Sequence, residues 1–272
     1  MLYLVATPIG NLGDITYRAV ETFRACDAVY CEDTRRTGQL LTYLGIEKPL
    51  YSCHTHNERM RSVEIVEQLQ AGKEIVYASD AGMPGVSDPG AILVQACIEN
   101  GLPFTVIPGA SAVLTAAVLS GLPTNHFSFF GFLPRETKPR NQILDTIAKT
   151  PHTCLLYESP HRVRDTLILL RDRLGDVNGA VLRELTKKFE SAHRGSLSEL
   201  IAFFETEPKG ECVIAVLPAP QESESVDPKE LFSELLESMS VRDAAEAAAE
   251  ALHISKKQAY AMALQYKSGS SE

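Results

Sequence analysis

Residues 75–90 read IVYASDAGMPGVSDPG, an apolar run followed at once by a loop of glycine, proline and aspartate. The run 75–78 is typical of a buried strand, and the stretch near 90–100 is a candidate helix. Three glycines and two prolines between them fix a backbone path that a ligand can approach closely. We interpret Asp88, before Pro89, as a helix N-cap with proline at the first helical position.

The same order of strand, loop and helix recurs through the first 120 residues. Apolar runs predict strands near 3–6, 28–31, 50–53, 75–78 and 104–107. Helical patterns lie near 16–25, 34–44, 57–70, 90–100 and 111–120. This alternation predicts an α/β fold with a largely parallel sheet that is covered by helices on both faces.

A turn-rich break at residues 121–125, GLPTN, predicts a domain boundary. Beyond it, strands are expected near 127–131, 153–157, 180–182, 189–193 and 212–216. Helices fit at 139–149, 160–174 and 196–206, the last opened by the capping pair Ser196 and Glu199. The sequence therefore predicts a second α/β domain with a more mixed sheet.

Residues 218–228, PAPQESESVDP, are polar and proline-rich, as an exposed linker is. Helical patterns follow at 228–239, at 242–252 after Ser240 and at 256–266 after Ser255. They are similar to a helix-turn-helix, and a plain helical packing appendage explains them equally well. We expect four parts: an N-terminal α/β domain 1–121, a second α/β domain 122–218, a linker 219–228 and a helical appendage 229–268.

The composition is that of a globular protein: 272 residues, 44% hydrophobic, with a net charge of −9. No apolar run approaches the ~20 residues of a bilayer span, and no signal peptide is evident, so we expect a cytoplasmic protein without a membrane partner. The six cysteines are scattered singly and are expected to be reduced core thiols. Cys53, His54 and His56 lack a second ligand pair, so no metal site is expected.

The net charge hides a local reversal. Residues 131–195 carry 12 basic and 8 acidic side chains, a local charge of +4. Attraction to phosphate depends on the local field, so this segment is where a nucleic acid would bind. An ordinary solvated face explains the charge equally well.

Glycine, proline, carboxylates and hydroxyls follow nearly every predicted strand. They occupy residues 7–11, 32–36, 54–56, 79–82, 108–111, 158–161 and 183–184. Any one group is explained as turn chemistry, but together they predict a ligand cleft at the carboxyl edge of the strands. The fingerprints for NAD, for ATP and for a serine nucleophile elbow are absent.

Several of these stretches resemble motifs of the tetrapyrrole methylase superfamily: VATPIGNLGD at 5–14, CEDTR at 31–35, SDAGMPGVSDPG at 79–90 and VIPGASA at 106–112. Three further stretches, FGFLP at 130–134, YESPHR at 157–162 and RELTKK at 183–188, narrow the resemblance to members that methylate a cytidine 2′-hydroxyl, cytidine 1402, in 16S rRNA. The resemblance covers residues 1–217. Ser79-Asp80-Ala81 departs from the Gly-Asp-Pro of small-molecule members, so the resemblance fixes the contacts of this loop only to within a residue or two.

The resemblance implies that S-adenosylmethionine binds in a cleft between two α/β domains of a homodimer, with the small ribosomal subunit as partner. Carried over position by position, the donor contacts are Pro8, Asp80, Gly82, Met83, Ser87, Ala110, Ser111, Tyr157, Glu158 and the segment from Ala215 to Pro218.

A ribose hydroxyl is a poor nucleophile, so a nearby base that takes its proton would help. The candidates at the cleft are Glu32, Asp33, Asp80, Glu158 and Glu184. We favour Asp33, with Glu32 beside it, because adjacent carboxylates raise one another's pKa and Arg35 can hold one of them in place. A phosphate or ribose clamp, or a helix-start ion pair, are the alternatives for this cluster.

Basic side chains near the same edge are the candidate phosphate contacts. They are Arg35, Arg36, Arg135, Arg140, Arg162, Lys187 and Lys188. One competing interpretation is a small-molecule methylase acting on a tetrapyrrole, against which the basic middle segment argues. Another is a non-enzymatic nucleotide-sensing regulator whose tail binds DNA, against which the sparse lysines of the tail argue.

Overall fold

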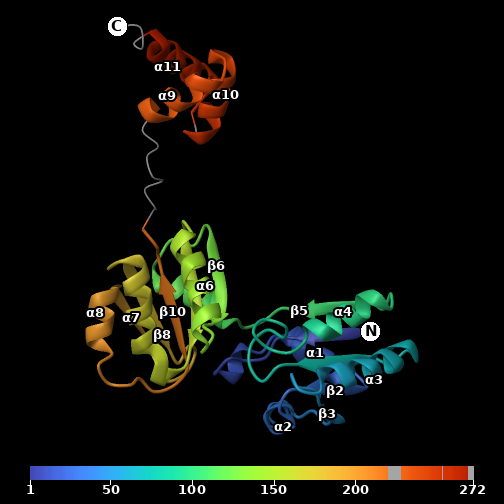
Figure 1. Cartoon of the computed structure of the whole chain (residues 1–272). Coiled ribbons are helices and arrows are strands. Elements are labelled where there is room, and N and C mark those ends of the chain that lie inside the picture. The colour runs from blue at the N-terminus through green and yellow to red at the C-terminus, as the bar shows by residue number, and fades with distance from the viewer. Residues whose placement is uncertain (220–227, 253, 269–272) are drawn as a thin grey trace. The chain divides into compact units, whose positions relative to one another are not determined.

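The computed structural model describes residues 1–219, 228–252 and 254–268 (Figure 1). The chain divides into two compact units, Met1–Ala219 and Pro220–Glu272. The predicted linker falls almost entirely outside the described residues. The division of the first unit at residue 121 stays a prediction.

The first sheet has five parallel strands, as the sequence predicts. They are β1 (Leu2–Val5), β2 (Ala28–Cys31), β3 (Leu50–Ser52), β4 (Ile75–Ala78) and β5 (Phe104–Ile107). Their order is β3-β2-β4-β1-β5, and every neighbouring pair is parallel. All carboxyl ends therefore meet at one edge, where the connecting loops gather.

Successive strand residues point to opposite sides of this sheet, and helices cover both sides. Its helices are α1 (Tyr17–Ala25), α2 (Thr34–Tyr43), α3 (Glu58–Gln70) and α4 (Ala91–Glu99), with a short 3₁₀ turn η1 (Leu12–Asp14) after β1. Leu4 and Tyr77 pack in one core with α3 and α4, whereas Val5 and Val76 pack in another with α1 and α2. The inner strands β2 and β4 are buried on both sides, which explains their continuous apolar runs.

The second sheet is mixed, which confirms the expectation from the sequence. Its strands are β6 (Phe127–Phe132), β7 (Thr153–Glu158), β8 (Asn178–Arg183), β9 (Ser191–Ser196) and β10 (Cys212–Val216). The order is β6-β7-β10-β8-β9, with a parallel β6–β7 pair and antiparallel pairs elsewhere.

One face of the second sheet packs on α6 (Thr137–Lys149), α7 (Val163–Leu174) and α8 (Leu197–Phe203), visible beside it in Figure 1. A 3₁₀ turn η2 (Pro160–Arg162) opens α7, and the predicted capping box of Ser196 and Glu199 opens α8. The other face packs on α5 (Ala112–Ser120), through Val113, Ala116 and Ala117. Helix α5 follows the last strand of the first sheet yet covers the second, so it links the two.

The C-terminal unit consists of α9 (Pro228–Ser238), α10 (Val241–Ala251) and α11 (Lys256–Ser268). Phe232, Ala248 and Ala259 lie in its own core, where the rings of Phe232 and Tyr266 stack 5.5 Å apart. The predicted N-caps are present: the hydroxyl of Ser240 accepts from Asp243 N at 3.2 Å, and that of Ser255 from Gln258 N at 3.3 Å. His253, part of the predicted turn, lies outside the described residues.

All six cysteines are buried free thiols, as expected. Across the described part of the chain, no helix is long and apolar enough to cross a bilayer. Nor do those residues contain a group of three or more His, Cys, Asp or Glu side chains placed to hold a metal ion.

Candidate active site

A cavity of about 330 Å³ lies within the first unit, and loops of both sheets line it. Such a volume is in the range of small-molecule sites. From the first sheet, the lining comes from Ile9 after β1, from residues 81–83 and 86–88 after β4, and from Ser111 at the start of α5. From the second sheet, the lining comes from Phe132, Tyr157, Glu158, Ser159, Pro160, Leu185, Glu211, Cys212 and Val213. Segments far apart in the sequence thus form one site at the carboxyl ends of parallel strands.

Six of the predicted donor contacts line this cavity. They are Gly82, Met83, Ser87, Ser111, Tyr157 and Glu158. Gly82 has a φ of 78°, and a Cβ there would lie 3.3 Å from Ile9 Cγ2, so the first and fourth loops meet closely because this residue is glycine. Ser87 has a φ of 62°, a left-handed backbone that is uncommon outside glycine and often found at functional sites.

Asp88 faces this cavity and is not the N-cap of α4, so that part of the sequence interpretation is wrong. The N-cap is Gly90, which has no side chain to accept from the first amides of α4, and another helix supplies the acceptor. The buried carboxylate of Glu58 in α3 accepts from Gly90 N at 2.8 Å and from Ile92 N at 3.2 Å. Because Glu58 accepts from these amides, Asp88 is not needed as the cap, and it lines the cavity with a hydrogen bond to the Ser79 side chain.

The carboxylates around Asp88 shift its acidity. Burial, and then the negative charges of Glu32 and Asp80, raise the pKa of Asp88 to about 6. Burial, followed by the charge of Asp80, also raises the pKa of Glu32. A carboxylate with a pKa near neutrality on a cavity wall is suited to accept a proton. Sequence reasoning missed Asp88 because the Asp-Pro pair suggested a cap.

The expected rise in the pKa of Asp33 is wrong. Asp33 caps α2, accepting from Arg35 N at 2.9 Å, while the Arg35 guanidinium donates to both carboxylate oxygens at 3.0 and 2.7 Å. These hydrogen bonds lower the pKa of Asp33 to about 2. The helix-start ion pair, one of the alternatives for this cluster, is what the geometry contains.

Two other predicted contacts, Pro8 and Asp80, line a second cavity of about 190 Å³ instead. Asp80 accepts from Asp33 N at 2.9 Å, and its other oxygen lies 3.6 Å from Arg36 Nε. Asp80 therefore ties the loop after β2 to the loop after β4. Its charge, together with that of Glu32, acts on Asp88 from there.

Glu158 lies in the cavity wall with both oxygens engaged by its own domain. It accepts from Ser159 N at 2.8 Å and from the Thr166 hydroxyl at 2.6 Å. Arg162, predicted to contact phosphate, lies 3.5 Å from this carboxylate and donates to Leu133 O at 3.0 Å. These contacts hold the loop after β7 against the end of β6.

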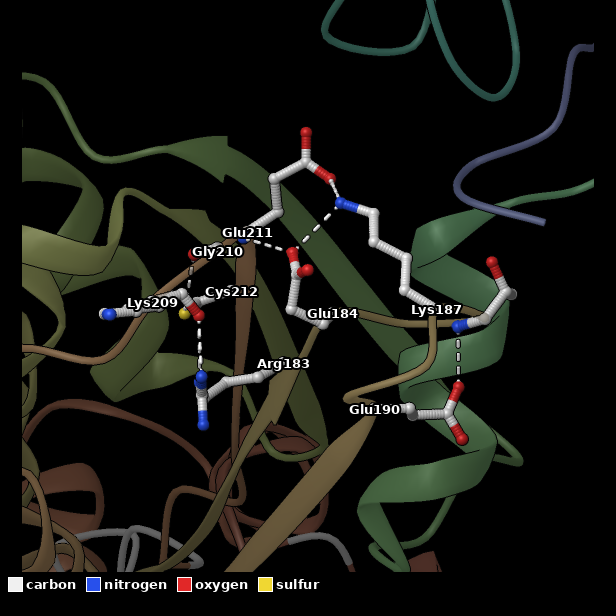
Figure 2. Close-up of polar contacts among 9 residues, drawn as sticks. Arg183, Glu184, Lys187, Glu190, Lys209, Gly210, Glu211 and Cys212 are labelled. Carbon is white, nitrogen blue, oxygen red and sulfur yellow. Dashed lines mark hydrogen bonds and ion pairs between the residues drawn. The ribbon is translucent and has the colours of Figure 1, made fainter.

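Lys187 lies between two carboxylates rather than alone on the surface. Figure 2 shows its ammonium pointing toward Glu184 at 2.9 Å and Glu211 at 2.8 Å. Glu184 also accepts from Glu211 N at 3.1 Å, and the Lys187 ammonium lowers the pKa of Glu184, which makes it a poorer base. Lys187 therefore joins the loop after β8 to the start of β10.

This Lys187 cluster forms a crowded wall beside the cavity. A Cβ on Gly10 would lie 2.5 Å from Lys187 Cγ, and one on Gly210 would lie 2.2 Å from Glu184 Oε1. Glu184 and Thr186 have left-handed φ values of 49° and 66°, unfavourable for a β-branched residue such as Thr186. Leu185 and Glu211, which belong to the same two segments, line the cavity.

The segment from Ala215 to Pro218 does not line the cavity, nor does Ala110. Strand β10 is antiparallel to β7, and Cys212 pairs with Glu158 whereas Val216 pairs with Cys154. The start of β10, not its end, therefore lies at the carboxyl edge of β7. Ala215 is fully buried in the core beneath α5.

The predicted phosphate contacts differ in availability. Arg135 and Lys188 are exposed, and the Lys188 ammonium lies 5.7 Å from the centre of the Phe189 ring. Arg35 is 86% exposed but bound to Asp33. Arg140 is half-buried, and its Nε has no hydrogen-bond partner.

Two linked α/β sheets whose loops converge on one cavity are typical of α/β proteins that bind a small molecule. The family model of tetrapyrrole (corrin/porphyrin) methylases matches residues 1–201, and the chain belongs to this family of S-adenosylmethionine-dependent enzymes. A second model, the RsmI C-terminal HTH domain, matches residues 222–267.

A relative from Synechocystis sp., named ribosomal RNA small subunit methyltransferase I, is 47% identical over 238 residues, 86% of this chain and 85% of the relative. Diphthine synthase has a similar fold, with a TM-score of 0.64 and 18% identity over 80% of this chain and 90% of that one. Uroporphyrin-III C-methyltransferase from Thermus thermophilus, complexed with S-adenosylhomocysteine, aligns with a TM-score of 0.57 and 18% identity over 79% and 96% of the two chains.

Proposed function

We propose that this chain transfers a methyl group from S-adenosylmethionine to the 2′-hydroxyl of cytidine 1402 in the 16S rRNA of the small ribosomal subunit. The observation that carries the proposal is the convergence of the motif loops of both sheets on one cavity. The 47% identity to a relative named for small-subunit rRNA methylation supports the substrate class.

The cavity residues fit the donor. Ile9, Val86 and Leu185 offer apolar surface for an adenine ring, and the N-terminus of α5 at Ser111 suits a carboxylate. Asp88 and Glu211 supply negative charge toward an ammonium or a sulfonium. When bound, S-adenosylmethionine supplies a methyl group that is already activated by the sulfonium.

The protein's main task is then positioning, because an aligned hydroxyl and methyl group need little further activation. As the new oxygen–carbon bond forms, the bond between the methyl carbon and the donor sulfur would break and leave S-adenosylhomocysteine. The hydroxyl proton must leave as well, and we assign it to the carboxylate of Asp88. Glu32 is the second candidate, since its pKa is also raised, and Asp33 is the third. Glu32 and Asp80 act on Asp88 by keeping its pKa high.

Arg35, Arg36, Arg135, Arg140 and Lys188 are the proposed contacts to the rRNA backbone. Arg162 and Lys187 are less exposed and are paired with carboxylates, so we assign them structural roles. An rRNA substrate also implies the cytoplasmic location expected from the sequence. A homodimer remains part of the proposal, and it rests on the resemblance to the family.

The test is methyl transfer to competing acceptors. The full-length protein is incubated with labelled S-adenosylmethionine and either unmethylated small ribosomal subunits, a tetrapyrrole or duplex DNA. We expect label in the 16S rRNA of the subunits alone. Label in the tetrapyrrole would favour the small-molecule alternative, and no label in intact unmethylated subunits would overturn the proposal.

A further inference from the structure

An exposed aromatic ring lies at the mouth of the cavity. Phe132 is the last residue of β6, is 52% exposed and lines the cavity wall. It belongs to the FGFLP stretch, for which the donor site and the proton transfer provide no role. A single exposed apolar side chain needs no explanation by itself, but the local backbone shows why this one lies here.

A β-bulge aims this side chain. Phe129 pairs with Leu155 and Phe132 pairs with Tyr157, so β6 has one residue more than β7 between these pairs. Bulges redirect side chains next to active sites. The extra residue leaves Gly131 at a φ of 64°, and a Cβ there would lie 3.1 Å from Ser87 Oγ. Glycine is therefore required for the bulge to fit against the long loop.

The ring of Phe132 is supported from inside the protein. Its centroid lies 5.5 Å from that of Tyr157, whose ring in turn lies 4.8 Å from Phe129 in an edge-to-face contact. Tyr157 also lines the cavity. A ring that is held by such contacts is pre-organised, so little side-chain freedom is lost when a second ring stacks on it.

We propose that Phe132 is the residue on which the base of the target cytidine stacks, an inference that rests on the proposed function. Proteins recognise unpaired RNA bases by stacking them on aromatic side chains. A base held at the cavity mouth brings its own ribose toward the donor methyl. Stacking supplies position rather than base identity, because every base has a π-face.

The test compares four variants of the full-length enzyme on unmethylated small subunits. Phe132→Ala and Phe132→Leu are expected to lower kcat/KM roughly ten- to a hundredfold, since base stacking is lost. Phe132→Tyr should stay within about threefold of wild type, because a tyrosine ring stacks as well. Phe203→Ala is the matched control: Phe203 is 59% exposed, lies against His193 and does not line the cavity.

Calorimetric titration with S-adenosylhomocysteine distinguishes a contact with the donor from a contact with the RNA base. We expect the same S-adenosylhomocysteine affinity for Phe132→Ala as for wild type. An equal loss of S-adenosylhomocysteine affinity would assign the ring to the donor and overturn the inference. Wild-type kinetics for Phe132→Leu or for Phe132→Ala would also overturn it. The wild-type reaction tests the proposed function separately. If wild-type enzyme leaves the subunits unmethylated, the proposed function is wrong, whatever the Phe132 variants do.

Discussion

The acidity of Asp88 arises from its burial and its neighbours. Burial of the carboxylate, and then the charges of Glu32 and Asp80, raise its pKa to about 6. Above a pH of about 6, the ionised carboxylate lowers the stability of the folded protein. This destabilisation disappears as the pH falls toward the ordinary pKa of an aspartate, near 4. A carboxylate held in this way is typical of a site where a proton is transferred.

Asp88→Asn should lower kcat on small subunits about a hundredfold or more, because the amide cannot take the hydroxyl proton. In wild type, kcat/KM should fall as the pH drops below about 6, where Asp88 becomes protonated. Asp33→Asn is the matched control, expected to retain most of its turnover. If Asp33→Asn is the more damaging change while RNA binding is intact, the base is Asp33 and the assignment made here is wrong.

Substitutions of the neighbouring residues Lys187 and Lys188 should affect the binding of different ligands. Lys188→Met is expected to weaken subunit binding and to reduce its salt dependence by about one charge, because an exposed phosphate contact is lost. Lys187→Met should instead weaken S-adenosylhomocysteine binding, since the ammonium joins Glu184 and Glu211 beside the cavity. Binding titrations at several salt concentrations measure both. Equal salt slopes for Lys188→Met and wild type would contradict this division.

Residue types were predictable from the sequence more reliably than their partners. The glycines and prolines of the long loop marked it as a candidate ligand loop in the sequence. Its residues Gly82, Met83 and Ser87 line the cavity. The roles of Asp33 and Lys187 depended on which charges face them, and those partners come from the folded chain.

Helix α4 depends on a cap from another helix. Glu58→Ala removes the carboxylate that accepts from Gly90 N and Ile92 N, which leaves buried amides unsatisfied. We expect a loss of about 1–3 kcal/mol in the free energy of unfolding, measured with urea, and weaker donor binding through the long loop. The exposed Glu67 of the same helix provides the control, Glu67→Ala. Equal midpoints for the two variants would rule out this cap as a stabilising contact.

Elements with a strong apolar pattern were predicted to within two residues at most ends. Strands β2 and β4 match the expected ranges, and β9 begins two residues later than expected and extends to Ser196. The direction of β10 did not follow from the sequence, because strand pairing is set by topology and not by local composition. The strand is antiparallel to β7, so Cys212 and Val213 line the cavity and Ala215 does not.

At the scale of the molecule, each unit has its own hydrophobic core. A chain ending at Ala219 should therefore fold and bind S-adenosylhomocysteine with the affinity of the full chain. Calorimetry and thermal unfolding test this expectation. A large loss of donor affinity on truncation would show that the C-terminal unit contributes to the cavity.

The net charge of −9 is a property of the whole chain, and the segment 131–195 opposes it. That segment carries Arg135 and Lys188, both exposed, and it also carries the Phe132 ring at the cavity mouth. Local positive charge and the exposed aromatic ring at the cavity therefore come from the same stretch of sequence.

The ribose of a cytidine in 16S rRNA is the proposed acceptor of the methyl group. The direct test is to cut rRNA from enzyme-treated, previously unmethylated subunits into oligonucleotides of known sequence and to locate the labelled nucleotide by tandem mass spectrometry. We predict 2′-O-methylcytidine at position 1402, formed by wild type and at least a hundredfold more slowly by Asp88→Asn. Label on a base, or on the ribose of another nucleotide, would contradict the account.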